Sequence, residues 1–252
     1  MEKLPKLFLK AFRAPEQPEL CKEFVSQHRK VLEDFGISHV TTNNERWLDD
    51  PLSYVIVALD EAGEMMGGIR LKMATPDEQL PMEQAVQKFD ERVHTELEAL
   101  LPYGNGEVCS LWNANRFRAM GIPILLSQAI TALSVQAGAG RMVCLVAHYT
   151  KKHPARNGFV VMENVGDNGT FDYPIPSIKA IAMVNPDTHL LHCADDQQRQ
   201  LLFSLRTRPD QVRIEKPGTT TFEVHYALRL ESNLVDLNAY RWISEERLRQ
   251  TA

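Results

Sequence analysis

The chain lacks the features that mark several large classes of protein. It has four cysteines in 252 residues, at positions 21, 109, 144 and 193, and their spacing matches no paired metal-binding motif. Its net charge of −5 argues against a general nucleic-acid binder, which needs an excess of basic residues. No segment approaches the roughly 18 consecutive apolar residues of a membrane-spanning helix. We therefore expect no metal, no nucleic-acid partner and no membrane span.

The cysteines and the N-terminus also bear on location. Cys109 and Cys144 fall within apolar segments, where a cysteine behaves as a small hydrophobic residue. The first twelve residues have an apolar run that is too short, and too interrupted by lysine, for a signal peptide. These features predict a reduced, cytoplasmic protein. We find no internal repeat and no low-complexity segment. With 44% hydrophobic and 24% charged residues, the chain is able to bury a full core.

Patterns of apolar residues predict a sheet flanked by helices. Apolar runs of good strand formers predict strands at 53–60, 65–73, 107–113, 141–148, 177–184 and 219–230. Helical spacing predicts helices at 19–35, 82–101, 195–205 and 237–249, and an almost wholly apolar helix from Pro123 to Gly138. The whole reads as an α/β (α+β) fold with a mixed central sheet, and we expect the helix from Pro123 to pack across that sheet.

Two turns within this pattern are informative. The runs 53–60 and 65–73 are joined by a short glycine-containing turn, which predicts an antiparallel hairpin, and the double glycine at 67 and 68 indicates a bulge or a close backbone approach. The second turn, RFRAMGIP at 116–123, leads from a strand into a helix. Free amides at a helix N-terminus, with basic residues beside them, suit a phosphate or pyrophosphate. A plain strand-to-helix turn carries the same pattern.

The order of these elements resembles a known family. R-x-x-G-x-P at 118–123 and Arg-Asn-Gly-Phe at 156–159 look like the acyl-coenzyme A binding core of the GNAT N-acyltransferase superfamily, whose phosphate loop is [QR]-x-x-G-x-[GA]. Pro123 stands where that loop has Gly or Ala. Within the superfamily the chain is most similar to acyl-homoserine-lactone synthases and long-chain N-acyl amino acid synthases. Those carry a Glu followed by a Ser-Arg pair on the strand before the loop; here Glu107 and Ser110 are present, and Leu111 follows the serine.

The resemblance implies an N-acyltransferase. Such an enzyme moves an acyl group from acyl-CoA, or from the phosphopantetheine of an acyl carrier protein, to the amine of a small acceptor such as an amino acid. The basic cluster at 151–156 suits a carrier protein or the 3′-phosphate of coenzyme A, or is simply a solvated turn. A GNAT-shaped binding or regulatory domain without catalysis is the alternative, favoured by Pro123 and by the missing arginine. The expected donor-binding residues are Leu111, Trp112, Asn113, Arg116, Arg118, Gly121, Ile122 and Ile124.

Acyl transfer to an amine needs a base for the attacking nitrogen and an acid for the leaving thiolate. Glu107 is the expected base, because a carboxylate half-buried beside the thioester would have a raised pKa. His148 and Tyr149 end the strand at which GNAT proteins admit the pantetheine arm, so both are catalytic candidates. The competing interpretations are a salt-bridged or solvated Glu107 and a surface histidine and tyrosine. A Cys109–His148 dyad is a weaker alternative, since no residue to orient the histidine is recognisable.

The resemblance also implies a domain organisation. We expect one GNAT-like domain over residues 1–252, with an N-terminal helical and lid segment at 1–52 and a C-terminal extension at 185–252. Trp47 is a candidate for the aromatic residue that the related lids carry. A tryptophan packed where a loop crosses the core is the plainer interpretation.

Overall fold

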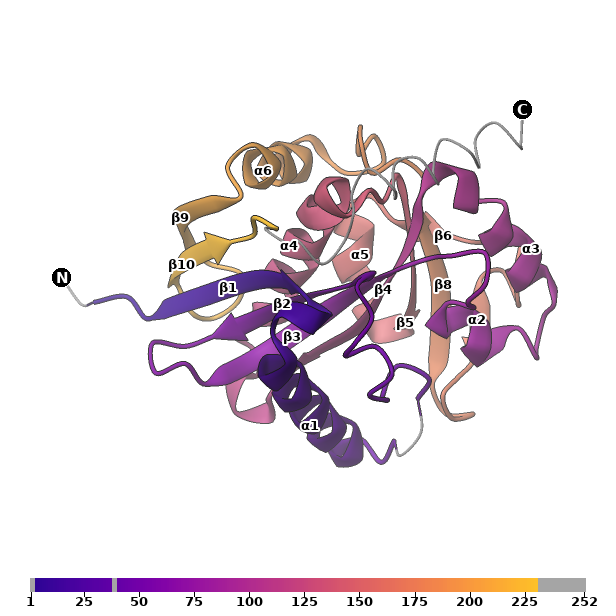
Figure 1. Ribbon diagram of the computed structural model, residues 1–252, viewed down its shortest axis with the longest axis horizontal. Helices are drawn as coiled ribbons and strands as arrows, with labels where there is room; N and C mark the ends of the chain where they lie inside the picture. Colours follow the sequence, from indigo (N-terminus) through magenta and orange to yellow (C-terminus); the bar gives the residue numbers. More distant parts are fainter. Residues whose placement is uncertain (1–2, 38–39, 231–252) are drawn as a thin grey trace.

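A mixed β-sheet organises the chain in the computed structural model, which describes residues 3–37 and 40–230 (Figure 1). The strand order is β6-β8-β5-β4-β3-β2-β1-β10-β9, and β7 also pairs with β8. Neighbours are antiparallel except for the parallel pairs β4–β5 and β1–β10. The strands are β1 (Lys6–Arg13), β2 (Ser53–Leu59), β3 (Met65–Met73), β4 (Asn105–Asn113), β5 (Arg141–Ala147), β6 (Val160–Val161), β7 (Thr170–Asp172), β8 (Lys179–Asn185), β9 (Asp210–Glu215) and β10 (Phe222–Ala227).

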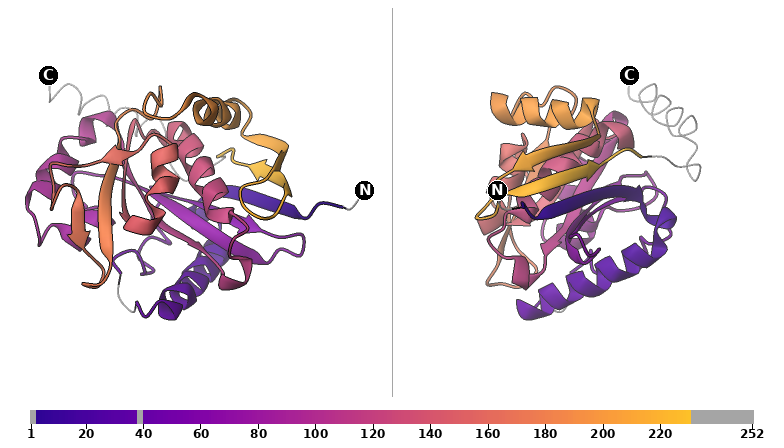
Figure 2. Two further views of the ribbon diagram at one scale, coloured as in Figure 1. Left: turned by 180° about the vertical axis from the view of Figure 1, so that it is seen from behind. Right: turned by 90° about the vertical axis from the view of Figure 1, so that its left-hand side faces the viewer.

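Helices cover both faces of this sheet, and the side view in Figure 2 separates the layers. On one face α4 packs on β2, β3 and β4, with α6 beside it. On the other face α1 covers the strands near β2 and β3, and α2 and α3 cover those near β5 and β8. The helices are α1 (Pro18–Asp34), α2 (Pro81–Val86), α3 (Arg92–Glu98), α4 (Ile122–Ala137), α5 (Lys152–Arg156) and α6 (Asp196–Thr207).

The predicted α/β fold is confirmed. The five strands expected between residues 53 and 184 all lie in the one sheet, and the helix that contains Pro123 packs across it. The double glycine also behaves as expected, because the register between β3 and β4 shifts just after Gly68. A Cβ on Gly68 would lie 2.4 Å from the Phe24 ring, so the absence of a side chain lets α1 approach the sheet closely.

The single helix predicted over 82–101 is wrong. The segment 82–101 forms two short helices, α2 and α3, and a 3-10 turn at Leu101–Tyr103. The break lies at Asp90, whose carboxylate accepts hydrogen bonds from the amides of Arg92 and Gly166. This interaction ties the break to a distant loop, and the apolar Phe89 just before it is exposed.

Four strands were not predicted, β1, β6, β7 and β9, of which β6 and β7 have only two and three residues. In β1 two lysines, Lys6 and Lys10, interrupt the apolar run, yet Leu7 and Leu9 between them are fully buried. In β9 charged and polar residues alternate with Val212 and Ile214, both exposed at the sheet edge. The predicted helix at 237–249 lies outside the described residues. Among the residues that the structure does describe, no helix is both long and apolar enough to cross a membrane.

Candidate functional site

The central feature of the site is a gap between two neighbouring strands. β4 and β5 pair only through Asn105–Glu107 and Arg141–Val143. Beyond these residues β4 stays paired with β3 as far as Asn113, and β5 stays paired with β8 as far as Ala147. Each strand is therefore held by its outer neighbour while the two diverge. The facing backbone groups of β4 and β5 are left free of the ladder.

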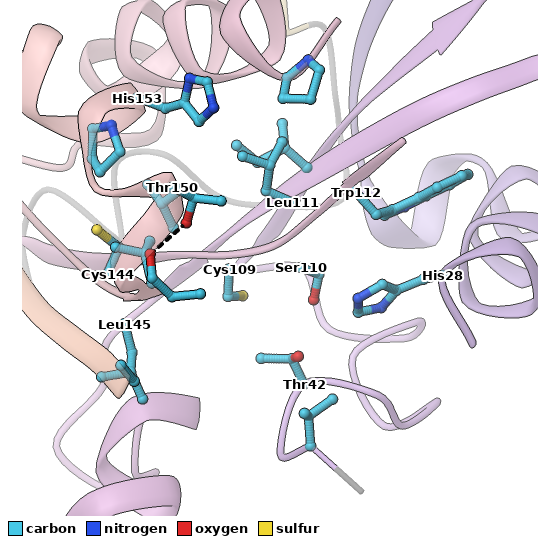
Figure 3. Close-up of a pocket in the computed structure, with 18 of the residues that line it drawn as sticks. His28, Thr42, Cys109, Ser110, Leu111, Trp112, Cys144, Leu145, Thr150 and His153 are labelled. Carbon is cyan, nitrogen blue, oxygen red and sulfur yellow. Dashed lines mark hydrogen bonds between the residues drawn. The ribbon is translucent and has the colours of Figure 1, made fainter. Parts of the chain in front are cut away.

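A cavity of about 470 Å³ occupies this gap (Figure 3). Residues from both diverging strands line it, together with α1, α4 and the segments at 40–42 and 149–154. Its walls are largely apolar, with Leu111, Leu145, Val146 and Phe159 among them. A mostly apolar cavity with few polar groups is typical of a site for a small organic ligand.

Glu107 lies where the two strands begin to diverge. Its side chain is 2% exposed but borders the cavity. Burial raises the pKa of this carboxyl from its usual value to about 8, against the opposing effects of the Met82 amide and of the Arg70 charge. The Met82 amide donates to Glu107 Oε2 at 2.8 Å. A carboxyl poised near neutral pH is suited to taking a proton from an amine.

The other two predicted catalytic residues follow β5 in a 3-10 turn, His148–Thr150. Tyr149 borders the cavity, although its side chain is 59% exposed. His148 packs edge-on against the Tyr149 ring and is not among the residues that line the cavity. Burial also raises the pKa of Cys109 to about 12, so the thiolate that a Cys109–His148 dyad needs is scarce.

The turn before α4 leaves three backbone amides without a hydrogen-bond partner in the part of the chain that the structure describes, and the Pro217–Gly218 segment packs against the turn. Ala119 and Gly121 both adopt positive φ, 63° and 83°. Within the described residues, the amides of residues 119, 120 and 121 donate no hydrogen bond, whereas the neighbouring Arg118 amide reaches Asn115 O. Free amides in such an alternating backbone can bind a phosphate. The Arg118 side chain borders the cavity and lies over the Phe35 ring.

Some of the remaining donor-binding candidates line the cavity and others lie outside it. Leu111, Trp112 and Asn113 line the cavity from β4. Arg116 is outside the lining and forms an ion pair with Glu64 in the β2–β3 turn. Ile122, the first residue of α4, is fully buried in the core, and Ile124 faces a second, polar hollow between α4 and α6.

Several residues that line the cavity carry no prediction from the sequence, among them His28, Ser127 and Tyr173. One signal was available for His28. It follows Cys21 and Phe24 at helical spacing on the buried face of α1, so it is a polar residue in an apolar stripe. Trp47, by contrast, packs against Phe24 and the Arg70 guanidinium outside the cavity, which is the plainer of its two interpretations.

A buried hydrogen-bond network supports the cavity wall. Asn157, within the predicted Arg-Asn-Gly-Phe motif, donates to Ser127 Oγ and accepts from Gln198 Nε2, at 2.8 and 2.6 Å. Its backbone carbonyl accepts from Asn185. Asn157, at the end of α5, therefore contacts α4, α6 and β8, and Ser127 borders the cavity.

Removing this amide leaves buried groups without partners. We expect Asn157→Ala to lower the free energy of unfolding by about 2–4 kcal/mol, measured by urea denaturation. Gln200→Ala, an exposed change on the neighbouring α6, is the control and is expected to stay within about 0.5 kcal/mol of wild type. Equal stability of the two variants would show that the network contributes little.

Sequence comparisons give no relative, since no family model and no curated protein matches the chain. Solved structures do match. The structure of BjaI, a CoA-dependent acyl-homoserine lactone synthase, matches with TM-score 0.57 and 15% identity over 94% of this chain and 99% of that one. FeeM, an N-acyl amino acid synthase from uncultured soil microbes, matches with TM-score 0.51 and 13% identity over 73% and 93%. The chain has the GNAT-like fold of these synthases.

The match extends to Escherichia coli ElaA, with TM-score 0.50 and 8% identity over 71% of this chain and 98% of that one. At these identities the likeness concerns the fold. It confirms the fold expected from the order of elements around the R-x-x-G-x-P turn. Among the described residues no group of three or more histidine, cysteine or acidic side chains is placed to hold a metal ion.

Proposed function

We propose that this protein is an N-acyltransferase that moves an acyl group from an acyl thioester to the amine of a small acceptor, such as an amino acid. The observation that carries the proposal is the divergence of β4 from β5 around an apolar cavity. The names of the matched synthases, which act on acyl donors, support it.

The donor has a natural path through this site. Its phosphates would meet the free amides of residues 119–121 and the Arg118 side chain, and its pantetheine arm would run along the free edge of β4. The Pro123 nitrogen has no hydrogen to donate to a phosphate, but the amides of residues 119–121 remain free to do so. Free backbone amides at the gap would stabilise the negative charge that develops on the thioester oxygen.

Chemistry then takes place beside Glu107. The acceptor nitrogen forms a bond to the thioester carbon, the carbon–sulfur bond breaks, and the products are an amide and a free thiol. Glu107, as a carboxylate, takes the proton that the nitrogen gives up. Tyr149 borders the cavity and is largely exposed, and its phenol would be able to protonate the departing thiolate.

The test is direct detection of product. We expect the purified protein, incubated with an equimolar mixture of amino acids and either octanoyl-CoA or an octanoyl carrier protein, to form an N-octanoyl amide detectable by mass spectrometry. Mass spectrometry is preferable to a thiol reagent, because Cys193 is exposed and would react. Binding of CoA without product from any amine would favour the non-catalytic domain, and neither binding nor product would leave only the fold.

A further inference from the structure

The proposed donor path leaves one polar patch of the cavity unused. It consists of His28 on α1 and Ser110 on β4, whose side chains lie next to each other in Figure 3. Both are buried, at 6% and 8% exposure. Apolar side chains surround the imidazole, with Phe24 edge-on at 6.1 Å between ring centres and Trp112 nearby in the same wall.

Neither group is satisfied by the protein. Within the described chain no hydrogen bond reaches the His28 ring. Its pKa is influenced only by burial and by the Arg70 charge. The Ser110 hydroxyl lies within reach of the Cys109 thiol, a weak partner, but makes no well-formed hydrogen bond. Buried polar groups are almost always paired. An imidazole and a hydroxyl that line a cavity without partners are therefore available to a ligand.

The backbone at Ser110 is held in an unusual conformation. Its φ of 53° lies in the left-handed region, which residues other than glycine seldom adopt. The strain coincides with the bulge in β4, where the register with β3 shifts between Gly68 and Arg70. Positive φ at a non-glycine residue tends to occur at functional sites, where the surrounding structure holds it.

The charge state of His28 limits what it can do. Burial, with a smaller effect of the Arg70 guanidinium, lowers its pKa to about 4. Cys21, about two turns away on α1, stays neutral because burial raises its pKa to about 12. His28 is therefore a neutral imidazole with a free lone pair, suited to accept a hydrogen bond from an amine N–H. Because of this low pKa, His28 is poorly suited to act as the base that takes up the proton of the amine.

We propose that His28 and Ser110 form the subsite for the acceptor's amino group. One ring nitrogen of His28 accepts a hydrogen bond from the amine, and Ser110 Oγ contacts the same nitrogen, so that its lone pair faces the thioester carbon in the gap. The proton lost during attack passes to Glu107, while the departing thiolate takes its proton from Tyr149, as in the proposed acyl transfer. This inference rests on the proposed acyl transfer, and it makes both residues contacts of the acceptor.

Kinetics of matched variants test the subsite. His28→Leu keeps an apolar body against Phe24 and removes the acceptor lone pair; it is expected to raise the KM for the amine roughly 10- to 100-fold, with the KM for octanoyl-CoA and the Tm unchanged. Ser110→Ala is expected to act in the same direction more weakly. His28→Gln, which restores a hydrogen-bond acceptor, is expected to recover part of the loss. His192→Leu, an exposed histidine outside the cavity, is the control. A wild-type KM for the amine in His28→Leu would overturn the subsite.

A binding experiment keeps this inference separate from the proposed function. In protein carrying ¹³C-labelled histidine, the His28 signal is identified by its loss in His28→Leu, and an equimolar amino-acid mixture is added as the probe. We expect the His28 signal to shift while the His192 signal does not. A shift without any acylated product would keep the subsite and reject acyl transfer. No shift, with product still formed, would reject the subsite and keep acyl transfer, and failure of both would reject both.

Discussion

Replacing Glu107 with glutamine is expected to lower kcat by roughly two to four orders of magnitude while leaving donor binding intact. Glutamine keeps the shape and the hydrogen bond from the Met82 amide but is unable to take a proton. In the wild-type enzyme the rate is expected to rise with pH and level off as the carboxyl ionises around its pKa of about 8. The measurements are the pH–rate profile of both proteins and calorimetric titration with CoA.

An unchanged rate in Glu107→Gln would contradict this prediction. If Glu107→Gln retains the rate and the pH profile of wild type, the base lies elsewhere and Glu107 is a buried structural acid. Lower activity with lower CoA affinity would instead indicate a distorted pocket. Glu98→Gln is a suitable control, because Glu98 is exposed on α3 and outside the cavity.

The raised pKa of Glu107 also predicts that the stability of the folded protein changes with pH. The folded-state pKa of Glu107 is raised from 4.5 to about 8, so between these values the folded state binds more protons than the unfolded state. The stability that the neutral carboxyl contributes is present below pH ~4.5 and is lost as pH rises through about 8, by an amount on the order of a few kcal/mol. Glu107→Gln is expected to lack this loss, which urea denaturation of both proteins across that range would show.

Replacing Arg118 with alanine is expected to weaken CoA binding by about 1–3 kcal/mol, a ~5- to 150-fold rise in Kd, through loss of a charge-assisted bond to phosphate. Its side chain borders the cavity and is exposed, so the Tm is expected to change little. Arg116→Ala is the matched control. This arginine is two residues away, but it is paired with Glu64 outside the cavity lining, and its removal is expected to leave the Kd within about twofold of wild type.

Calorimetry with CoA and with an acyl carrier protein decides between these outcomes. Equal affinity of Arg118→Ala and wild type for both donors would remove the phosphate-loop interpretation. Gly121 is a poor place for the same test. At its φ of 83°, a Cβ would lie 2.5 Å from the Pro217 backbone, so any side chain there disturbs folding as well as binding.

The sequence was most informative where a local pattern has one physical cause. The helix from Pro123 to Gly138 was predictable from proline near its start and glycine at its end, and the hairpin from two apolar runs around a tight turn. The break in 82–101 was not, because it depends on a hydrogen bond between Asp90 and the distant Gly166 amide. Strand β1 was missed because Lys6 and Lys10 interrupt its short apolar run, and the alternating burial of its residues follows only from its pairing with β2 and β10.

The residues of the candidate site also fall into two groups, those predictable from the sequence and those that only the folded structure identifies. Glu107 and Arg118 were found because they belong to a contiguous motif around the strand and the turn. His28 was not found, since it reaches the cavity only when α1 packs across β3 and β4, a contact made possible by the missing side chain of Gly68. Arg116 and Arg118 look equivalent in the sequence, and only the position of Glu64 in the folded hairpin distinguishes them.

A crystal structure with a non-hydrolysable thioether analogue of octanoyl-CoA tests the central claim most directly. We predict that the pyrophosphate lies against the amides of residues 119–121, and that the pantetheine arm enters the gap where β4 and β5 diverge. The carbon that replaces the thioester carbonyl should then lie beside Glu107. Density for the analogue outside this gap, with β4 and β5 enclosing none of it, would contradict the account.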